Sequence, residues 1–164
     1  MSDDRALATR VAELAELLVA KGLKLSTAES CTGGGLAKSL TDRPGSSAWF
    51  EFGWVTYGNN AKHQLLGVRE ATLDEYGAVS QQVAEQMASG ARRLSGADIA
   101  VAITGIAGPA GGSADKPVGT VWLAWAGPGD LMGAERREFP GDRAAIRSQA
   151  VAAALDGTLA RVPR

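Results

Sequence analysis

The spacing of hydrophobic residues changes between helical and strand-like periods along the chain. Apolar residues recur every three or four positions over residues 4–21, and Gly22 follows as a helix stop. An apolar-tending run over residues 23–28 predicts a strand over 23–29, and residues 99–104 form a short, almost wholly apolar run that is typical of a buried central strand. An aromatic and β-branched run predicts another strand over residues 50–57. Helices and strands therefore alternate in this chain.

The rest of the chain continues this alternation. Further helices are expected over residues 33–41, 61–66, 69–76, from Ser80 onward, and over 142–159. Asn60 is a candidate N-cap for the second of these helices, because asparagine is favoured at that position. Residues 118–126 and 133–139 are expected to form the last two strands.

This order of elements predicts an α/β fold, a three-layer α/β/α sandwich around a mixed, mostly parallel sheet of about five strands. The link between the last two strands is too short for a helical crossover, so one strand there should be antiparallel. We expect residues 1–164 to form a single domain. In such sheets, ligands bind beyond the strand ends, where several loops meet.

Composition and charge narrow the classes of partner and location. The net charge is -1 and aromatic residues make up 5% of the chain, which argues against a nucleic-acid partner. No apolar run reaches the ~20 residues of a membrane helix, so no membrane partner is expected. The chain has one cysteine and one histidine, which disfavours a disulfide and a zinc site and suits the cytoplasm.

Residues 27–35 (Thr-Ala-Glu-Ser-Cys-Thr-Gly-Gly-Gly) join the first strand to the next helix. Backbone amides at such a corner can bind an anion or an oxyanion, and glycine lets a ligand approach closely. Ser30 could be a nucleophile, an anion ligand, or the N-cap of the helix. Cys31 is expected to be a buried structural thiol, because no second cysteine or histidine nearby suggests activation.

A second candidate place follows the strand over residues 50–57. Lys62 lies in the first turn of the next expected helix, where a cation is electrostatically unfavourable. It is either a surface lysine or a lysine with a lowered pKa that serves as general base to Ser30. Tyr57 either faces the same cleft or is an aromatic residue on its rim.

Two further places carry anion-binding chemistry. The loop over residues 105–117 contains four glycines and two prolines, and it is either a connector or functional. Thr104 precedes it, so its hydroxyl and the following amides are candidate anion donors. Arg143 and Arg147 share one helix face, where like charges repel unless an anion joins them. A solvated helix face is the alternative interpretation.

Together these motifs resemble the C-terminal domain family of the competence/damage-inducible protein CinA. The resemblance covers about residues 5–160 in order. Its motifs are Thr-Ala-Glu-Ser-Cys-Thr-Gly-Gly at 27–34, Gly-Ser-Ser-Ala-Trp-Phe at 45–50, Val-Thr-Tyr at 55–57, Gly-Ala-Val-Ser at 77–80, Thr-Gly-Ile-Ala-Gly-Pro at 104–109 and Lys-Pro-Val-Gly-Thr-Val at 116–121.

The resemblance implies hydrolysis of nicotinamide mononucleotide to nicotinic acid mononucleotide and ammonia, in pyridine nucleotide recycling. It also implies a serine mechanism without metal or cofactor, and a homodimer or higher homo-oligomer. Carried over by motif, Ser30 is the nucleophile, and Tyr57, Lys62 and Thr104 complete the catalytic set. Which of Lys62 and Tyr57 takes the proton is left open. The substrate-binding positions are Cys31, Thr32, Gly33, Gly34, Gly105, Gly108 and Arg143.

Two other functions are compatible with parts of the sequence. A non-catalytic nucleotide-binding or regulatory domain could use the same pocket. A role in DNA uptake or repair is suggested by the family's name, but the net charge of -1 and the few aromatic residues argue against it.

Overall fold

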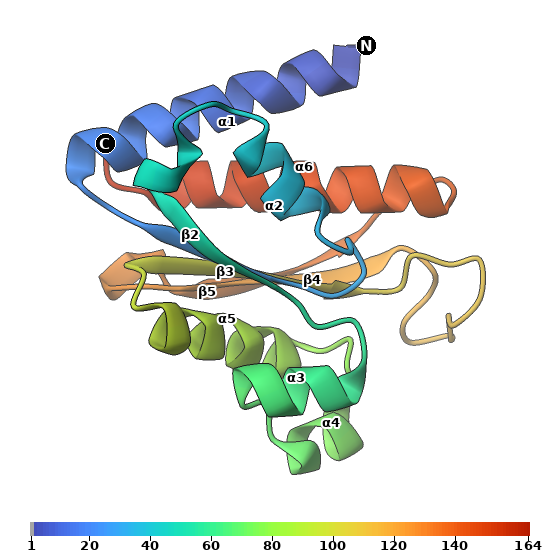
Figure 1. Ribbon diagram of the computed structural model, residues 1–164. Helices are drawn as coiled ribbons and strands as arrows, with labels where there is room; N and C mark the ends of the chain where they lie inside the picture. The colour runs from blue at the N-terminus through green and yellow to red at the C-terminus, as the bar shows by residue number, and fades with distance from the viewer. Residues whose placement is uncertain (1) are drawn as a thin grey trace.

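A five-stranded mixed sheet forms the middle layer of the computed structural model, which describes residues 2–164 (Figure 1). The strands are β1 (Leu25–Glu29), β2 (Phe50–Val55), β3 (Ile99–Gly105), β4 (Thr120–Ala126) and β5 (Gly133–Glu138). Their order across the sheet is β2-β1-β3-β4-β5. β1 runs parallel to β2 and β3, whereas β4 is antiparallel to both of its neighbours. The expected mixed sheet with one reversed strand is confirmed.

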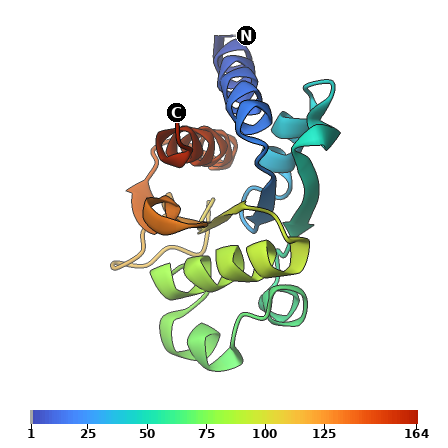
Figure 2. The ribbon, with the colours of Figure 1, turned by 90° about the vertical axis from the view of Figure 1, so that its left-hand side faces the viewer.

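Helices cover both faces of the sheet, as Figures 1 and 2 show. On one face lie α1 (Ser2–Lys21), α2 (Gly35–Thr41) and α6 (Arg143–Arg161). On the other lie α3 (Asn59–Leu66), α4 (Glu70–Tyr76) and α5 (Gln81–Ser95). Two short 3-10 helices, Ser46–Ala48 and Gly129–Leu131, precede β2 and β5. The three-layer α/β/α arrangement is therefore the one that the sequence predicts.

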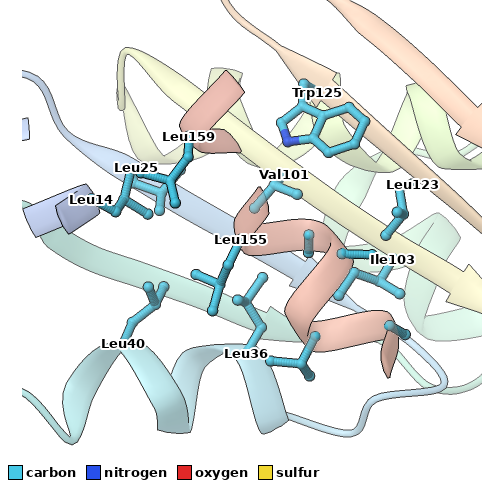
Figure 3. Close-up of a cluster of buried hydrophobic side chains, with 14 of the residues drawn as sticks. Leu14, Leu25, Leu36, Leu40, Val101, Ile103, Leu123, Trp125, Leu155 and Leu159 are labelled. Atoms are coloured by element: carbon cyan, nitrogen blue, oxygen red, sulfur yellow. The ribbon is translucent and has the colours of Figure 1, made fainter. Parts of the chain in front are cut away.

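Strand alternation divides the core between the two faces. Val101 and Ile103 pack with the leucines of α1, α2 and α6, as Figure 3 shows. Ala100 and Ala102, which alternate with them along β3, face α5. Because alanines are small, α5 can pack closely on the sheet. Along β1, Leu25 packs in the core on the face of α1, α2 and α6, and Ala28 packs in the core on the face of α5. Successive residues at the end of β1 are therefore directed to opposite faces of the sheet.

Two element boundaries differ from the sequence-based expectation near the sheet's edge. Helix α3 begins at Asn59 rather than residue 61, and its N-cap is Gly58, not Asn60. The backbone N–H of Lys62 donates to the Gly58 carbonyl at 3.1 Å, so the helix's first hydrogen bond reaches two residues further back than expected. Strand β2 ends at Val55, which leaves Tyr57 in the link between β2 and α3.

Among residues 2–164, no helix combines the length and the apolar character that crossing a membrane requires. The longest helices, α1 and α6, instead pack one face on the core and carry charged residues on the other, as Arg10 and Asp156 illustrate by pairing across them. Their amphipathic pattern is that of helices that cover a sheet.

The contact between α3 and α5 depends on Gly90. A Cβ atom at Gly90 would lie 2.0 Å from the carbonyl oxygen of Leu66, at the end of α3. Gly90 itself is fully enclosed between the two helices. Because the obstacle is backbone, it cannot move aside as a side chain would. This glycine therefore sets how closely α3 approaches α5.

We expect Gly90→Ala to destabilise the fold despite alanine's higher helix propensity. The propensity gain is about 1 kcal/mol, but forcing α3 from α5 is overpacking, which costs roughly 1–3 kcal/mol or more. Urea denaturation would measure the loss in unfolding free energy. Ser89→Ala, an exposed change on the same helix, is the matched control and should shift it by less than about 0.5 kcal/mol. A Gly90→Ala protein as stable as this control would contradict the packing argument.

Candidate active site

The three parallel strands end at the same edge of the sheet, and the chain stays paired just beyond them. The Ser30 amide donates to the Ile103 carbonyl at 2.9 Å, and the Thr56 amide donates to the Glu29 carbonyl at 2.8 Å. Both bonds extend the strand ladder past the formal ends of β1 and β2. Ser30 is therefore held on its backbone between the loops that follow β2 and β3, where the sequence predicts a ligand site.

Lys62 reaches this edge from α3. Its Nζ lies 2.9 Å from Ser30 Oγ, 2.9 Å from the Thr56 carbonyl and 3.0 Å from the Tyr57 carbonyl. Only 1% of Lys62 and 7% of Ser30 is exposed. The amine is thus surrounded by three oxygens and almost no water. The structure brings Lys62 and Ser30 into direct hydrogen-bond contact.

Burial lowers the pKa of Lys62 to about 8, because a charged amine loses its hydration in this enclosure. Within residues 2–164, no carboxylate lies within 4.0 Å of its Nζ to offset that loss. A neutral amine can donate two N–H bonds to the Thr56 and Tyr57 carbonyls while its lone pair accepts the Ser30 hydroxyl. This arrangement is that of a nucleophile with its general base.

Glu29 organises the corner on the opposite face of β1. Its carboxylate is completely buried. Oε1 accepts hydrogen bonds from the Thr32 hydroxyl at 2.7 Å and the Leu36 amide at 2.8 Å, and Oε2 accepts one from the Ala37 amide at 3.0 Å. The carboxylate therefore satisfies the first amides of α2, where a negative charge is electrostatically favoured.

The capping interpretation of Ser30 is wrong. Helix α2 begins at Gly35, two residues later than expected, and its N-cap is Gly34 with a φ of 100°, which only glycine adopts readily. The Gly33 and Gly35 amides donate to the carbonyls of Ser30 and Thr32 at 3.0 Å each. Since Glu29 takes the next two amides, the amides of Gly35, Leu36 and Ala37 are all occupied. Ser30 is available for chemistry instead.

Some donors at the corner stay available. Within residues 2–164, the amides of Thr32 and Gly34 donate to no protein acceptor. The thiol of Cys31 is buried, and that burial raises its pKa to about 11, so it remains protonated at neutral pH. This agrees with the expectation of a structural thiol. The Thr32 hydroxyl already donates to Glu29 and both side chains are buried, so the backbone amide of Thr32 is the available donor at this position.

Arg143 ties two loops together at the same edge. One nitrogen, Nη1, donates to the Gly108 carbonyl at 2.7 Å, and the other, Nη2, donates to the Tyr57 hydroxyl at 2.8 Å. More than half of Tyr57 is exposed. Its hydroxyl is thus directed to Arg143, while its carbonyl holds Lys62. The structure brings Tyr57 to the site mainly through its backbone, which the sequence alone does not indicate.

Thr104 and its glycines have structural tasks in the loop after β3. Thr104 is buried, and its hydroxyl donates to the Ala78 carbonyl at 2.9 Å, just before α5. A Cβ at Gly105 would lie 2.9 Å from the Thr120 carbonyl, and one at Gly108 would lie 2.5 Å from Val118 Cγ1. These glycines therefore allow the loop to pack on the start of β4. The Thr104 oxygen can still accept a hydrogen bond.

Arg147 lies at the corner and not beside Arg143's partners. Its Nη2 donates to the Thr32 carbonyl at 3.4 Å, and a Cβ on Gly33 would be only 2.9 Å from the same nitrogen. In the described part of the chain, neither Arg143 nor Arg147 has a carboxylate within 4.0 Å. Arg143 and Arg147 start from neighbouring turns of α6, but their side chains contact two different parts of the site.

Two residues of the site are missing from the set of site residues predicted from the sequence. Glu29 stood within the motif without a role, although an acidic residue ending an apolar strand shortly before a helix is a signal for capping. Arg147 was named with Arg143 as one of two arginines that an anion could join, but only Arg143 was placed among the substrate-binding residues. In residues 2–164, no group of three or more histidine, cysteine, aspartate or glutamate side chains is placed to bind a metal ion.

A cavity with a volume of about 830 Å³ lies beside the corner and is lined by residues of α1, α2 and α6. Neither Ser30 nor Lys62 lines it, but Thr32, Gly35 and Arg147 do. The cavity therefore adjoins the corner that carries Ser30 but does not include the serine–lysine contact itself.

The lowered pKa of Lys62 predicts how stability depends on pH. Below about pH 8 the native state holds the buried charge, and between about 8 and 10.4 only the unfolded state keeps the proton. The unfolding free energy of wild type should therefore rise over this range relative to Lys62→Met, by at most about 1.4 kcal/mol per pH unit. Urea denaturation of both proteins across this range measures the difference. A difference independent of pH would contradict a lowered pKa.

Known proteins similar to this chain were found by family model and by sequence. The model described as the CinA C-terminal domain matches residues 7–162. Nicotinamide-nucleotide amidohydrolase PncC of Escherichia coli strain K12 is 57% identical over 144 residues, covering 87% of each chain. The protein of the same name from Pseudomonas putida is 58% identical over 153 residues, covering 93% of each. A CinA-like protein of Akkermansia muciniphila is 55% identical over 142 residues, covering 87% of this chain but 34% of its own length.

Solved structures agree with this result. The competence damage-inducible protein A (ComA) from Klebsiella pneumoniae superposes with a TM-score of 0.91 at 41% identity, over 94% of this chain and 96% of that one. The competence/damage inducible protein CihA from Agrobacterium tumefaciens gives a TM-score of 0.85 at 46% identity, over 96% and 94%. The whole sandwich, and not one motif, is shared with these proteins.

Proposed function

Because the chain belongs to the CinA C-terminal domain family, we propose that it hydrolyses the amide of nicotinamide mononucleotide. The products are nicotinic acid mononucleotide and ammonia. Relatives named nicotinamide-nucleotide amidohydrolase match it along most of their length. The observation that carries the proposal is the 2.9 Å contact between Lys62 Nζ and Ser30 Oγ, combined with the lowered pKa of Lys62.

In the first step, the neutral amine of Lys62 accepts the proton of the Ser30 hydroxyl. Ser30 Oγ attacks the carboxamide carbon, and the carbonyl oxygen becomes an oxyanion. A carboxamide is a poor electrophile, so both a base and oxyanion donors are needed. The free amides of Thr32 and Gly34 are candidate donors, as are those near Cys31 and Gly105. Losing one such donor typically costs ~10²–10³ in rate.

The protonated Lys62 then gives its proton to the departing nitrogen, so ammonia leaves as the carbon–nitrogen bond breaks. A water molecule attacks the resulting ester, with Lys62 again taking the proton, and Ser30 is regenerated with release of the carboxylate. We assign the base role to Lys62 and not to Tyr57, because the Tyr57 hydroxyl is bound to Arg143. Thr104 fixes the chain before α5 and can accept one hydrogen bond from the substrate.

The remaining predicted substrate contacts form two edges of the pocket. We propose that the backbone of residues 31–34 lies along one side of the substrate and that of Gly105 and Gly108 along the other. Arg143 would close the pocket between Tyr57 and Gly108, where it already bridges two loops. We further propose that residues 1–164 act as one domain, in the cytoplasm and as a homo-oligomer.

A non-catalytic nucleotide-binding domain is the competing function. The burial of Lys62 argues against it, because holding an amine without a counter-charge costs stability and gives no advantage for binding alone. Perturbed pKa values of this kind gather at catalytic sites. The serine–lysine contact therefore favours the enzyme.

Ser30→Ala is expected to release ammonia from nicotinamide mononucleotide at least ~10³-fold more slowly than wild type, because a nucleophile acts as a unit with its base. The same protein should still bind the nucleotide. An ammonia-release assay measures the rate, and Ser89→Ala on the exposed face of α5 is the matched serine control. Wild-type activity in Ser30→Ala would contradict the serine mechanism.

A further inference from the structure

Arg147 has a guanidinium with unused hydrogen-bonding capacity at the catalytic corner. The group carries five N–H donors, yet its one protein acceptor in residues 2–164 is the Thr32 carbonyl, at a long 3.4 Å. No carboxylate of the described chain lies within 4.0 Å of it. The side chain is half-buried, unlike that of a fully solvated surface arginine. Such a group favours an anion, which can accept two of its bonds at once.

Two other anion-binding features at this edge are wholly or partly occupied, while the free amides of Thr32 and Gly34 are candidate oxyanion donors. The first amides of α2 are bound by the carboxylate of Glu29. Two donors of the Arg143 guanidinium already bind the Gly108 carbonyl and the Tyr57 hydroxyl. Arg147, which makes only one long hydrogen bond, is therefore the arginine of the two with more donors left for a ligand.

Its position suits the far end of a nucleotide whose amide lies at Ser30. The hydrogen bond from the Gly33 amide to the Ser30 carbonyl closes a turn, so the two Cα atoms are within about 7 Å. Arg147 Nη2 is next to Gly33, and Gly33 is exposed. In nicotinamide mononucleotide, the ring and the ribose separate the amide from the phosphate. A substrate extended from Ser30 past Gly33 would bring its phosphate to Arg147.

There is also room for an anion beside this guanidinium, because Arg147 lines the cavity of about 830 Å³. The other cations that line the cavity are paired: Lys38 with Asp42 at 2.7 Å, and Arg10 with Asp156 at 2.6 Å. The carboxylates of Asp3 and Asp4 also line it and disfavour an anion near α1. The attractive position for a phosphate is thus the Arg147 end.

We propose that Arg147 binds the 5′-phosphate of the substrate and so makes the site selective for a phosphorylated nicotinamide nucleoside over the free nucleoside. This inference rests on the proposed function. It also explains the glycine at position 33: with a φ of 60°, and with Arg147 so close, a side chain there would be strained and would push the guanidinium from the corner.

The test compares two ligands that differ only in the phosphate. In the Ser30→Ala background, calorimetry gives the Kd of nicotinamide mononucleotide and of nicotinamide riboside, with and without Arg147→Gln. Arg147→Gln should weaken nucleotide binding roughly 10- to 100-fold, the usual range for hydrogen bonds to a charged group. It should change riboside binding less than about threefold. Arg147→Lys should recover part of the loss, since it keeps the charge but not the fork of donors.

Two controls make the outcome decisive. Arg93→Gln, at an exposed position on α5, removes the same charge away from the corner and should leave both Kd values unchanged. Inorganic phosphate should compete with the nucleotide in proteins that keep Arg147 and at least ~10-fold less well in Arg147→Gln. Equal weakening of both ligands would show that Arg147 only supports the corner, and no weakening of either would also overturn the proposal.

The binding comparison is independent of turnover. If wild type released no ammonia from nicotinamide mononucleotide, the proposed reaction would fail, while the Kd values would still decide the role of Arg147. If wild type is active and the two ligands lose affinity equally, the reaction stands and the phosphate contact fails. Phosphate binding that depends on Arg147 without any difference between nucleotide and riboside would assign the site to a separate anion and overturn its link to the substrate.

Discussion

The buried amine of Lys62 is the constraint on which the rest of the site depends. An amine with 1% exposure and no counter-charge in the described chain is stable only if its hydrogen bonds are satisfied by neutral oxygens. Two backbone carbonyls, from Thr56 and Tyr57, supply that satisfaction, and the Ser30 hydroxyl supplies the third contact. Helix α3 must therefore stay docked on α5, which the close approach at Gly90 permits.

The opposite face of β1 carries the complementary charge. Glu29 is one residue before Ser30, so strand alternation directs it away from Lys62 and into the first turn of α2. It neutralises the helix end that would otherwise attract an anion. As a result, the corner has one face for a carboxylate that holds the backbone and another for a hydroxyl that reacts. The glycines allow the chain to pass between these faces in little space.

Much of this was accessible from the sequence because it follows from local pattern. The order of elements, the mixed sheet and the meeting of the Ser30 corner with Lys62 come from periodicity, strand ends and the family motifs. What was missed depends on geometry that periodicity does not encode. Helix α3 begins at Asn59 because its first hydrogen bond is to Gly58. Tyr57 acts through its carbonyl because β2 ends before it.

The sequence also does not predict which groups the long charged side chains contact. Arg143 and Arg147 lie one helical turn apart. Arg143 nevertheless binds Gly108 and Tyr57, whereas Arg147 donates to the Thr32 carbonyl and lies beside Gly33. Spacing gives a shared face but not the loop that each side chain meets. Glu29 likewise contacts the α2 amides because the glycine turn brings the start of α2 back to the end of β1.

The central claim is that neutral Lys62 is the base for Ser30, and the pH dependence of kcat/KM for nicotinamide mononucleotide tests it most directly. This parameter reports the ionisation of the free enzyme's essential base. The account predicts that kcat/KM rises about tenfold per pH unit in the acid range and levels off above an apparent pKa of about 8, where Lys62 loses its proton. A profile that is flat from about pH 6.5 to 9.5, across the range in which that proton is lost, would contradict it.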